Sequence, residues 1–167
     1  ESAFETEIDS KNKNDVIYTL STYYISKKMP EKAIIYLKEY DTAYDTGIEW
    51  SISHKKIKLG HILNYMTALL QLDDLDGAKL LYDDWIDLMN EFIDDDELGL
   101  RIRGTLADYH LNFLDGISTL LLIDNVDDLS IQSYKMIFTA QKAFAYRLLK
   151  RPDDEKRFLE KAYALCE

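Results

Sequence analysis

Hydrophobic residues recur with the period of an α-helix along most of the chain. The clearest stripe has the i, i+3, i+4, i+7 spacing of a helix that buries one side, and it consists of Leu59, Ile62, Leu63, Met66, Leu69 and Leu70. Short polar residues and Gly77 then interrupt the pattern, and a second stripe runs from Ala78 to Met89. Because the connection is short, the two helices must lie antiparallel with their apolar sides facing each other. This stretch therefore predicts a helical hairpin.

The same period predicts six more helices, which pair in sequence order. They are expected at residues 15–28, 31–44, 98–113, 117–123, 131–150 and 154–165. Four hairpins follow, at about 14–44, 50–90, 97–123 and 130–166, after a polar lead-in at 1–13. The helix at 117–123 is so apolar that we expect it to be buried on more than one side.

The connections recur at Pro30, Gly77, Gly116 and Pro152, separated by 47, 39 and 36 residues. A loose period near forty is typical of a stacked helical repeat. When the four hairpins are aligned, two sets of equivalent positions lie in the first helices: an early position (Ile17, Ile62, Ile102, Thr139) and one seven residues later (Tyr24, Leu69, Tyr109, Tyr146). Two further sets lie in the second helices: their start (Ala33, Ala78, Ser118, Glu155) and a position inside them (Leu37, Tyr82, Leu122, Leu159).

This pattern resembles the tetratricopeptide repeat over about residues 14–167. In that family, small residues let paired helices approach closely, and aromatic and leucine positions fill the space between them. The match has departures, since Met66 and Leu106 stand where the family prefers a small residue, Glu155 stands where it prefers alanine, and the period exceeds the family's 34. The resemblance implies an all-α, right-handed superhelical solenoid of about four hairpins.

A solenoid of this kind has a concave face that can hold a peptide or protein segment. By analogy with the family, the contacting positions are Tyr18, Thr22, Asn64, Thr67, Gln71, Arg103, His110, Gln141, Phe144 and Arg147. The amides of Asn64 and Gln141 could pair with an extended peptide backbone. Arg103 and Arg147 could meet an acidic group or a C-terminal carboxylate of the ligand.

Composition narrows the class of partner. The chain has a formal charge of −11 and is 47% hydrophobic, so it can fold around a core but repels nucleic acid and anionic membranes. It shows no apolar run of the roughly 20 residues that span a bilayer and no signal sequence. Its single cysteine, Cys166, excludes an internal disulfide framework. We therefore expect a cytoplasmic protein.

No spacing of reactive residues predicts catalysis. His54 and His61 are two helical turns apart, which is too far for one zinc ion without other ligands. The acidic run at 94–97 lacks the spaced ligands and turn glycine of a calcium loop, and it suits the positive start of a helix. Cys166 has no neighbouring activator apart from chain-end charges. We expect no metal, no cofactor and no enzymatic activity.

Two functions remain. The irregular period and tyrosine-rich helices look like the repeat domains of intracellular peptide-sensing transcriptional regulators of Gram-positive bacteria, which carry an N-terminal helix-turn-helix or helical bundle that these residues do not show. Chaperone-docking relatives are disfavoured, because Tyr18 and Thr22 stand at their carboxylate-clamp positions. The alternative is a structural assembly or homodimerisation scaffold that uses apolar surface on Trp50, Phe92 or the last helix.

Overall fold

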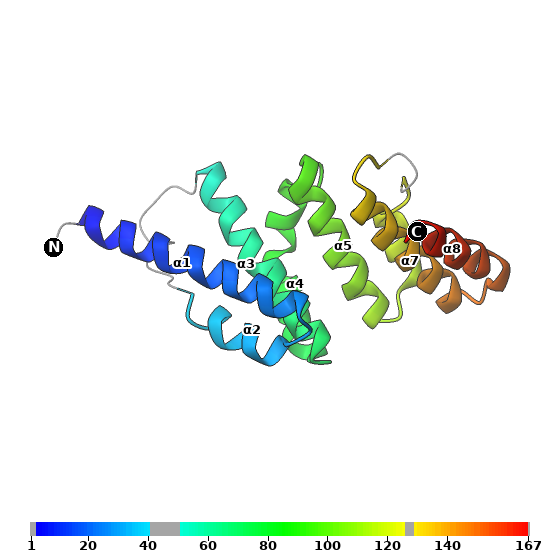
Figure 1. Cartoon of the computed structure of the whole chain (residues 1–167), viewed down its shortest axis with the longest axis horizontal. Helices are drawn as coiled ribbons and strands as arrows, with labels where there is room; N and C mark the ends of the chain where they lie inside the picture. The colour runs from blue at the N-terminus through cyan, green and yellow to red at the C-terminus, as the bar shows by residue number, and fades with distance from the viewer. Residues whose placement is uncertain (1–2, 41–50, 126–128, 167) are drawn as a thin grey trace. The chain divides into compact units, whose positions relative to one another are not determined.

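A computed structural model describes residues 3–40, 51–125 and 129–166, with side chains from Asn12 onward. Within these ranges the chain forms eight α-helices and no strand, which confirms the all-α prediction (Figure 1). The helices are α1 (Ala3–Ser26), α2 (Pro30–Leu37), α3 (Ile52–Gln71), α4 (Leu75–Glu91), α5 (Asp96–Asn112), α6 (Gly116–Leu122), α7 (Gln132–Leu148) and α8 (Pro152–Ala164). Neighbouring helices along the chain pack in sequential pairs, among them α1 with α2, α5 with α6 and α7 with α8.

The helix boundaries differ from the sequence pattern mainly in the first hairpin. α1 begins at Ala3 instead of Asp15, so most of the predicted polar lead-in is helical. α2 ends at Leu37, which is earlier than the predicted Tyr44, and residues 41–44 lie outside the described ranges. The other helices begin and end within a few residues of the predicted positions.

All four hairpin connections have the same backbone geometry. The second residue after each first helix adopts a left-handed conformation, with φ of 56°, 60°, 60° and 56° at Lys28, Asp73, Leu114 and Lys150. The next N–H donates to the carbonyl five residues back, as in Met29 to Tyr24, Asp74 to Leu69, Asp115 to His110 and Arg151 to Tyr146. This pair of features defines the Schellman motif, which satisfies the carbonyls at a helix end. Each second helix starts two residues after the left-handed residue.

The turns correct the predicted register in two places. Gly77 lies inside α4, and Asp73 is the residue that turns the chain. In the third hairpin the equivalent positions move forward by one residue, to Arg103, His110, Thr119 and Ile123 in place of Ile102, Tyr109, Ser118 and Leu122. The shift places the fully buried Ala107, instead of Leu106, at the position for a small residue.

The chain divides into two compact units, residues 1–90 and 91–167. A core cluster in the first unit consists of Ala33, Leu37 and Ala68, with Tyr24, Ile25, Ile34 and Tyr65 packed against it. A core cluster in the second unit consists of Ala107, Ile123 and Phe138, with Leu100, Leu122, Leu129 and Tyr134 packed against it. Each cluster joins more than one hairpin.

The short helix α6 is buried on one side only. Gly116, Thr119 and Ile123 are buried, and the helix packs against α5 and α7. Ile117 and Leu121 point the other way and are largely exposed. The expectation that this helix is buried on more than one side is therefore wrong.

Candidate functional site

In the first unit, Asn64 connects two helices. Its side chain is buried, and its Nδ2 donates to Ser21 Oγ at 3.0 Å and to Thr22 Oγ1 at 2.9 Å, which ties α3 to α1. Ser21 Oγ in turn donates to the Tyr18 carbonyl at 3.0 Å. The amide group that the sequence assigns to a peptide ligand is therefore engaged inside the protein.

Replacing Asn64 with alanine should lower the free energy of unfolding by about 1–3 kcal/mol, because the change removes two interhelical hydrogen bonds, one of them buried. Urea denaturation followed by circular dichroism measures this loss. Thr67→Ala is a matched control, since Thr67 Oγ1 donates only to the Leu63 carbonyl of its own helix at 2.8 Å. Equal losses in the two variants would contradict this structural role for Asn64.

The remaining predicted contact residues of the first unit lie on α1 and α3. The Tyr18 ring packs against Gly60, where an added Cβ would come within 3.0 Å of it, and meets the His61 ring edge-on at 5.6 Å between centroids. Gln71 is half-buried at the end of α3, and its Oε1 is buried without a hydrogen-bond partner. Thr22 is exposed and accepts the bond from Asn64.

In the second unit, Gln141 repeats the role of Asn64. It is buried, and its Nε2 donates to the Gly104 carbonyl at 2.9 Å and to Asp108 Oδ1 at 2.7 Å, which ties α7 to α5. Counted from the four turns, Asn64 and Gln141 occupy the same position of their hairpins. An amide that recurs at one repeat position is the sequence signal that indicates interhelical pairing.

Arg103 lies at the edge of a hollow of about 500 Å³ at the start of α5. Its Nε donates to the Ile93 carbonyl at 3.2 Å, and its Nη2 pairs with Asp94 Oδ1 at 2.7 Å. The hollow is lined by Ile93, Asp94, Asp95, Asp96, Glu97, Leu100, Arg103, Leu129, Ser130 and Ile131. Four acidic side chains around one paired arginine disfavour the carboxylate ligand that the sequence suggests here.

His110 lies in the last turn of α5, close to the connection to α6. Its Nδ1 lies 3.7 Å from Asp115 Oδ2, and Asp115 Oδ1 accepts the Ser118 N–H at 3.0 Å at the start of α6. Burial lowers the pKa of His110 below its ordinary 6.5, and attraction to Asp115 offsets part of that effect. Hydrogen bonds from Ser118 lower the pKa of Asp115 below its ordinary 3.8.

These directions predict two windows of acid destabilisation. The folded protein binds a proton at His110 less readily than the unfolded chain does. Protonation of His110 therefore costs no stability above pH 6.5, and the free energy of unfolding falls as the pH drops from there toward the lowered pKa. The Asp115 contribution is present above pH 3.8 and is lost below it.

His110→Leu should remove the loss of stability in the first window. Leucine suits this position, because Leu69 occupies the equivalent position of the second hairpin. Urea midpoints of both proteins between about pH 7.5 and 5 measure this difference. Parallel pH profiles for wild type and variant would contradict the assignment to His110.

On α7, Phe144 and Arg147 form an exposed pair. The Phe144 ring is 47% exposed, and the Arg147 guanidinium carbon lies 5.2 Å from its centroid. Arg147 Nε also donates to Glu155 Oε1 at 2.7 Å. An exposed aromatic ring beside a cation can bind an apolar group and an anionic group of the same ligand. Of the predicted contact residues, this pair best keeps the chemistry that the sequence assigned to it.

The apolar residues that the sequence suggests for assembly are only partly exposed in the structure. Phe92 is buried, so it offers no apolar surface, and Trp50 lies outside the described residues. On the last helix Leu159 and Tyr163 are exposed, whereas Phe158 is buried and stacks on Tyr146 at 5.3 Å.

Across residues 3–40, 51–125 and 129–166, no three His, Cys, Asp or Glu side chains come together as a metal site would require. None of the helices described here is both long and apolar enough to cross a membrane. The acidic residues Asp96 and Glu97 lie in the first turn of α5, where the helix dipole favours them.

No known protein family, curated protein or solved structure matches this sequence.

Proposed function

We propose that the chain is a non-catalytic binding module of tetratricopeptide-like hairpins that holds a peptide or protein segment. The observation that carries this proposal is the exposed Phe144 ring beside Arg147. At the equivalent position the other three hairpins carry Thr22, Thr67 and Asp108. The other hairpins thus keep a polar residue on this helix surface, and we assign the large ring of the fourth hairpin, with the cation beside it, to contact with a ligand.

The four equivalent turns support the tetratricopeptide-like proposal, and with it a solenoid arrangement of the hairpins. The ligand would place an apolar side chain on the Phe144 ring and a carboxylate near Arg147. Following the resemblance, we propose a signalling peptide as this ligand, with the chain as the sensing part of a bacterial transcriptional regulator.

The test uses peptides selected on the wild-type protein from a random library displayed with free C-termini. Phe144→Ala and Arg147→Ala should each lower the affinity for the selected peptides about tenfold. The melting temperature should change little, because both side chains are exposed. Ile35→Ala, an exposed apolar residue of α2, is the control and should leave affinity unchanged. Equal binding by wild type and both variants, or a library without binders, would contradict the proposal.

The second candidate is an assembly scaffold, which the exposure of Tyr163 and Leu159 on α8 favours. Sedimentation velocity separates the two functions. A scaffold would form an oligomer that Tyr163→Glu dissociates, whereas a peptide-binding module would keep its size in that variant.

A further inference from the structure

The hairpin of α5 and α6 has an apolar outer surface. Leu114 is 74% exposed, Ile117 62% and Leu121 77%, and the half-exposed Phe113 precedes them at the end of α5. We call Phe113, Leu114, Ile117 and Leu121 the α5–α6 patch. Ile117 and Leu121 are one helical turn apart, so they form a single ridge on the side of α6 opposite its buried residues.

The other hairpins show that this surface need not be apolar. At the left-handed turn position they carry Lys28, Asp73 and Lys150, where the third hairpin carries Leu114. Three residues later they carry Glu31, Asp76 and Asp153, where the third hairpin carries Ile117. An exposed leucine gains nothing from packing, and its backbone is held in a conformation that leucine rarely adopts. The fold therefore gives no reason for these side chains.

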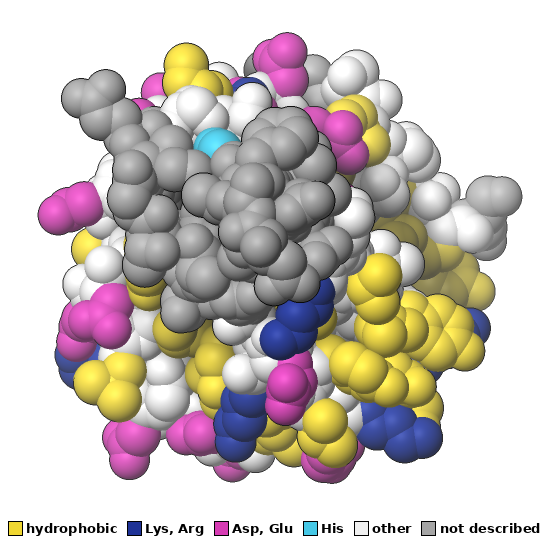
Figure 2. Space-filling view, turned by 90° about the vertical axis from the view of Figure 1, so that its left-hand side faces the viewer, with side chains coloured by type: hydrophobic (Ala, Val, Ile, Leu, Met, Phe, Trp, Pro, Cys, Tyr) yellow, Lys and Arg dark blue, Asp and Glu magenta, His cyan; other side chains and the backbone are white. Residues whose placement is uncertain are grey.

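The chain segment that carries the patch is acidic. Residues 104–134 contain no lysine or arginine, and Asp115 lies between Leu114 and Ile117 in the chain. On the face in Figure 2, by comparison, hydrophobic side chains lie near Lys and Arg as well as near Asp and Glu. In the first unit, Lys27 Nζ lies 5.7 Å from the ring centroid of the exposed Tyr23. Charge complementarity thus selects a basic occupant for the α5–α6 patch.

From these observations we infer that the α5–α6 patch docks an amphipathic helix of a partner protein, with a stripe of branched apolar side chains flanked by Lys or Arg. The ridge of Ile117 and Leu121 packs into the groove between residues of the partner's apolar stripe. The basic flanks face Asp115, which lies between Leu114 and Ile117 in the chain. This surface is separate in residues and in ligand charge from the proposed peptide site at Phe144 and Arg147.

The experiment uses a fluorescent helical peptide of about 18 residues made of Leu and Lys, with Leu at helical spacing, titrated at about 150 mM salt. The double substitution Leu114→Asp with Ile117→Asp copies Asp73 and Asp76 of the second hairpin, so the fold tolerates it. Docking on the patch predicts at least about tenfold weaker binding. Attraction by net charge alone predicts stronger binding, because the variant gains two negative charges.

The matched control is Ile35→Asp with Leu80→Asp, which adds the same charge at exposed apolar residues of other hairpins and should change affinity less than about twofold. Phe144→Ala should also leave this peptide bound, which separates the inference from the proposed peptide site. Unchanged or tighter binding by the Leu114/Ile117 variant would overturn the inference, and so would equal binding of a peptide with Glu in place of Lys. Oligomers of the protein alone that this variant dissociates would identify a second copy as the occupant and would also overturn it.

Discussion

Gly99→Ala should lower the free energy of unfolding by about 2 kcal/mol or more, although alanine is the better helix former. A Cβ at this position would lie 2.4 Å from the Ile93 carbonyl oxygen and 3.2 Å from that of Phe92. Both atoms belong to the backbone, so no side-chain rotation relieves the overlap. The segment before α5 would have to move, and with it the bonds that Arg103 makes to Ile93 and Asp94.

Gly77→Ala is the matched control, because Gly77 also lies in a helix. The three atoms nearest to its added Cβ would all belong to the side chain of Asp74, with Oδ2 at 2.9 Å, and that exposed carboxylate can rotate away. The gain in helix propensity, about 1 kcal/mol, then offsets any weakening of the bond from the Gly77 N–H to Asp74. Urea unfolding of both variants should show a loss at Gly99 and little change or a gain at Gly77. A similar loss at both positions would show that backbone contact at Gly99 is not the cause.

The sequence predicts the helices well because burial follows their period. Leu59, Leu63 and Met66 belong to the predicted stripe of α3, and all three are fully buried. The turns are harder to predict, because glycine is the expected residue for a left-handed backbone, and here Lys28, Asp73, Leu114 and Lys150 take that conformation. Backbone hydrogen bonds fix these turns, so side-chain type marks their position only loosely.

The candidate site is predicted less well, because polarity does not tell which way a side chain faces. Asn64 and Gln141 interrupt apolar stripes, which favours an exposed position, yet each forms hydrogen bonds to a neighbouring helix from a buried position. Phe144 differs from them, since the resemblance places it on a contacting surface and the structure leaves it exposed. For both amides, the partners that decide the outcome lie on a helix far away in sequence.

The apolar composition of α6 misleads for a related reason. Hydrophobicity states how much surface a helix could bury, but the number of neighbouring helices decides how much it does bury. α6 packs against α5 and α7, and its outer residues Ile117 and Leu121 stay exposed. Some of the apolar residues of α6 therefore lie on the protein surface, and this follows from the arrangement of the neighbouring helices and not from the composition of α6.

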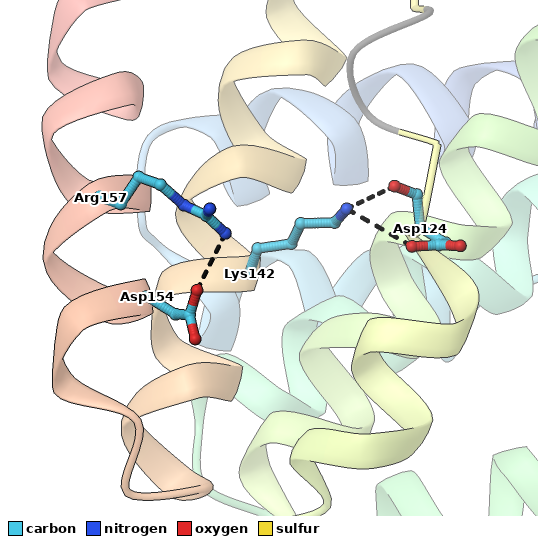
Figure 3. Close-up of polar contacts among 4 residues, drawn as sticks. All are labelled: Asp124, Lys142, Asp154 and Arg157. Atoms are coloured by element: carbon cyan, nitrogen blue, oxygen red, sulfur yellow. Dashed lines mark hydrogen bonds and ion pairs between the residues drawn. The ribbon is translucent and has the colours of Figure 1, made fainter.

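Lys142→Met should lower the free energy of unfolding by about 1–3 kcal/mol. Lys142 is buried on α7, and its Nζ donates to the carbonyl of Asp124, just beyond the end of α6 (Figure 3). The ammonium also lies 3.9 Å from Asp124 Oδ1 and 5.6 Å from the Phe158 ring centroid. A cation suits a helix C-terminus, where carbonyls lack partners within the helix. Methionine keeps an unbranched apolar chain up to the ε position, so the loss reports mainly on the ammonium group.

Arg157→Met provides the comparison within the same unit. Arg157 Nη2 pairs with Asp154 Oδ1 at 2.9 Å, three residues away on α8, and its side chain is largely exposed (Figure 3). An exposed pair within one helix contributes about 0.5 kcal/mol or less, because water screens it and two long side chains must be ordered. The ratio of the two losses is therefore the decisive quantity. If both variants unfold at the same urea concentration, the contact between Lys142 and Asp124 does not hold the end of α6 against α7.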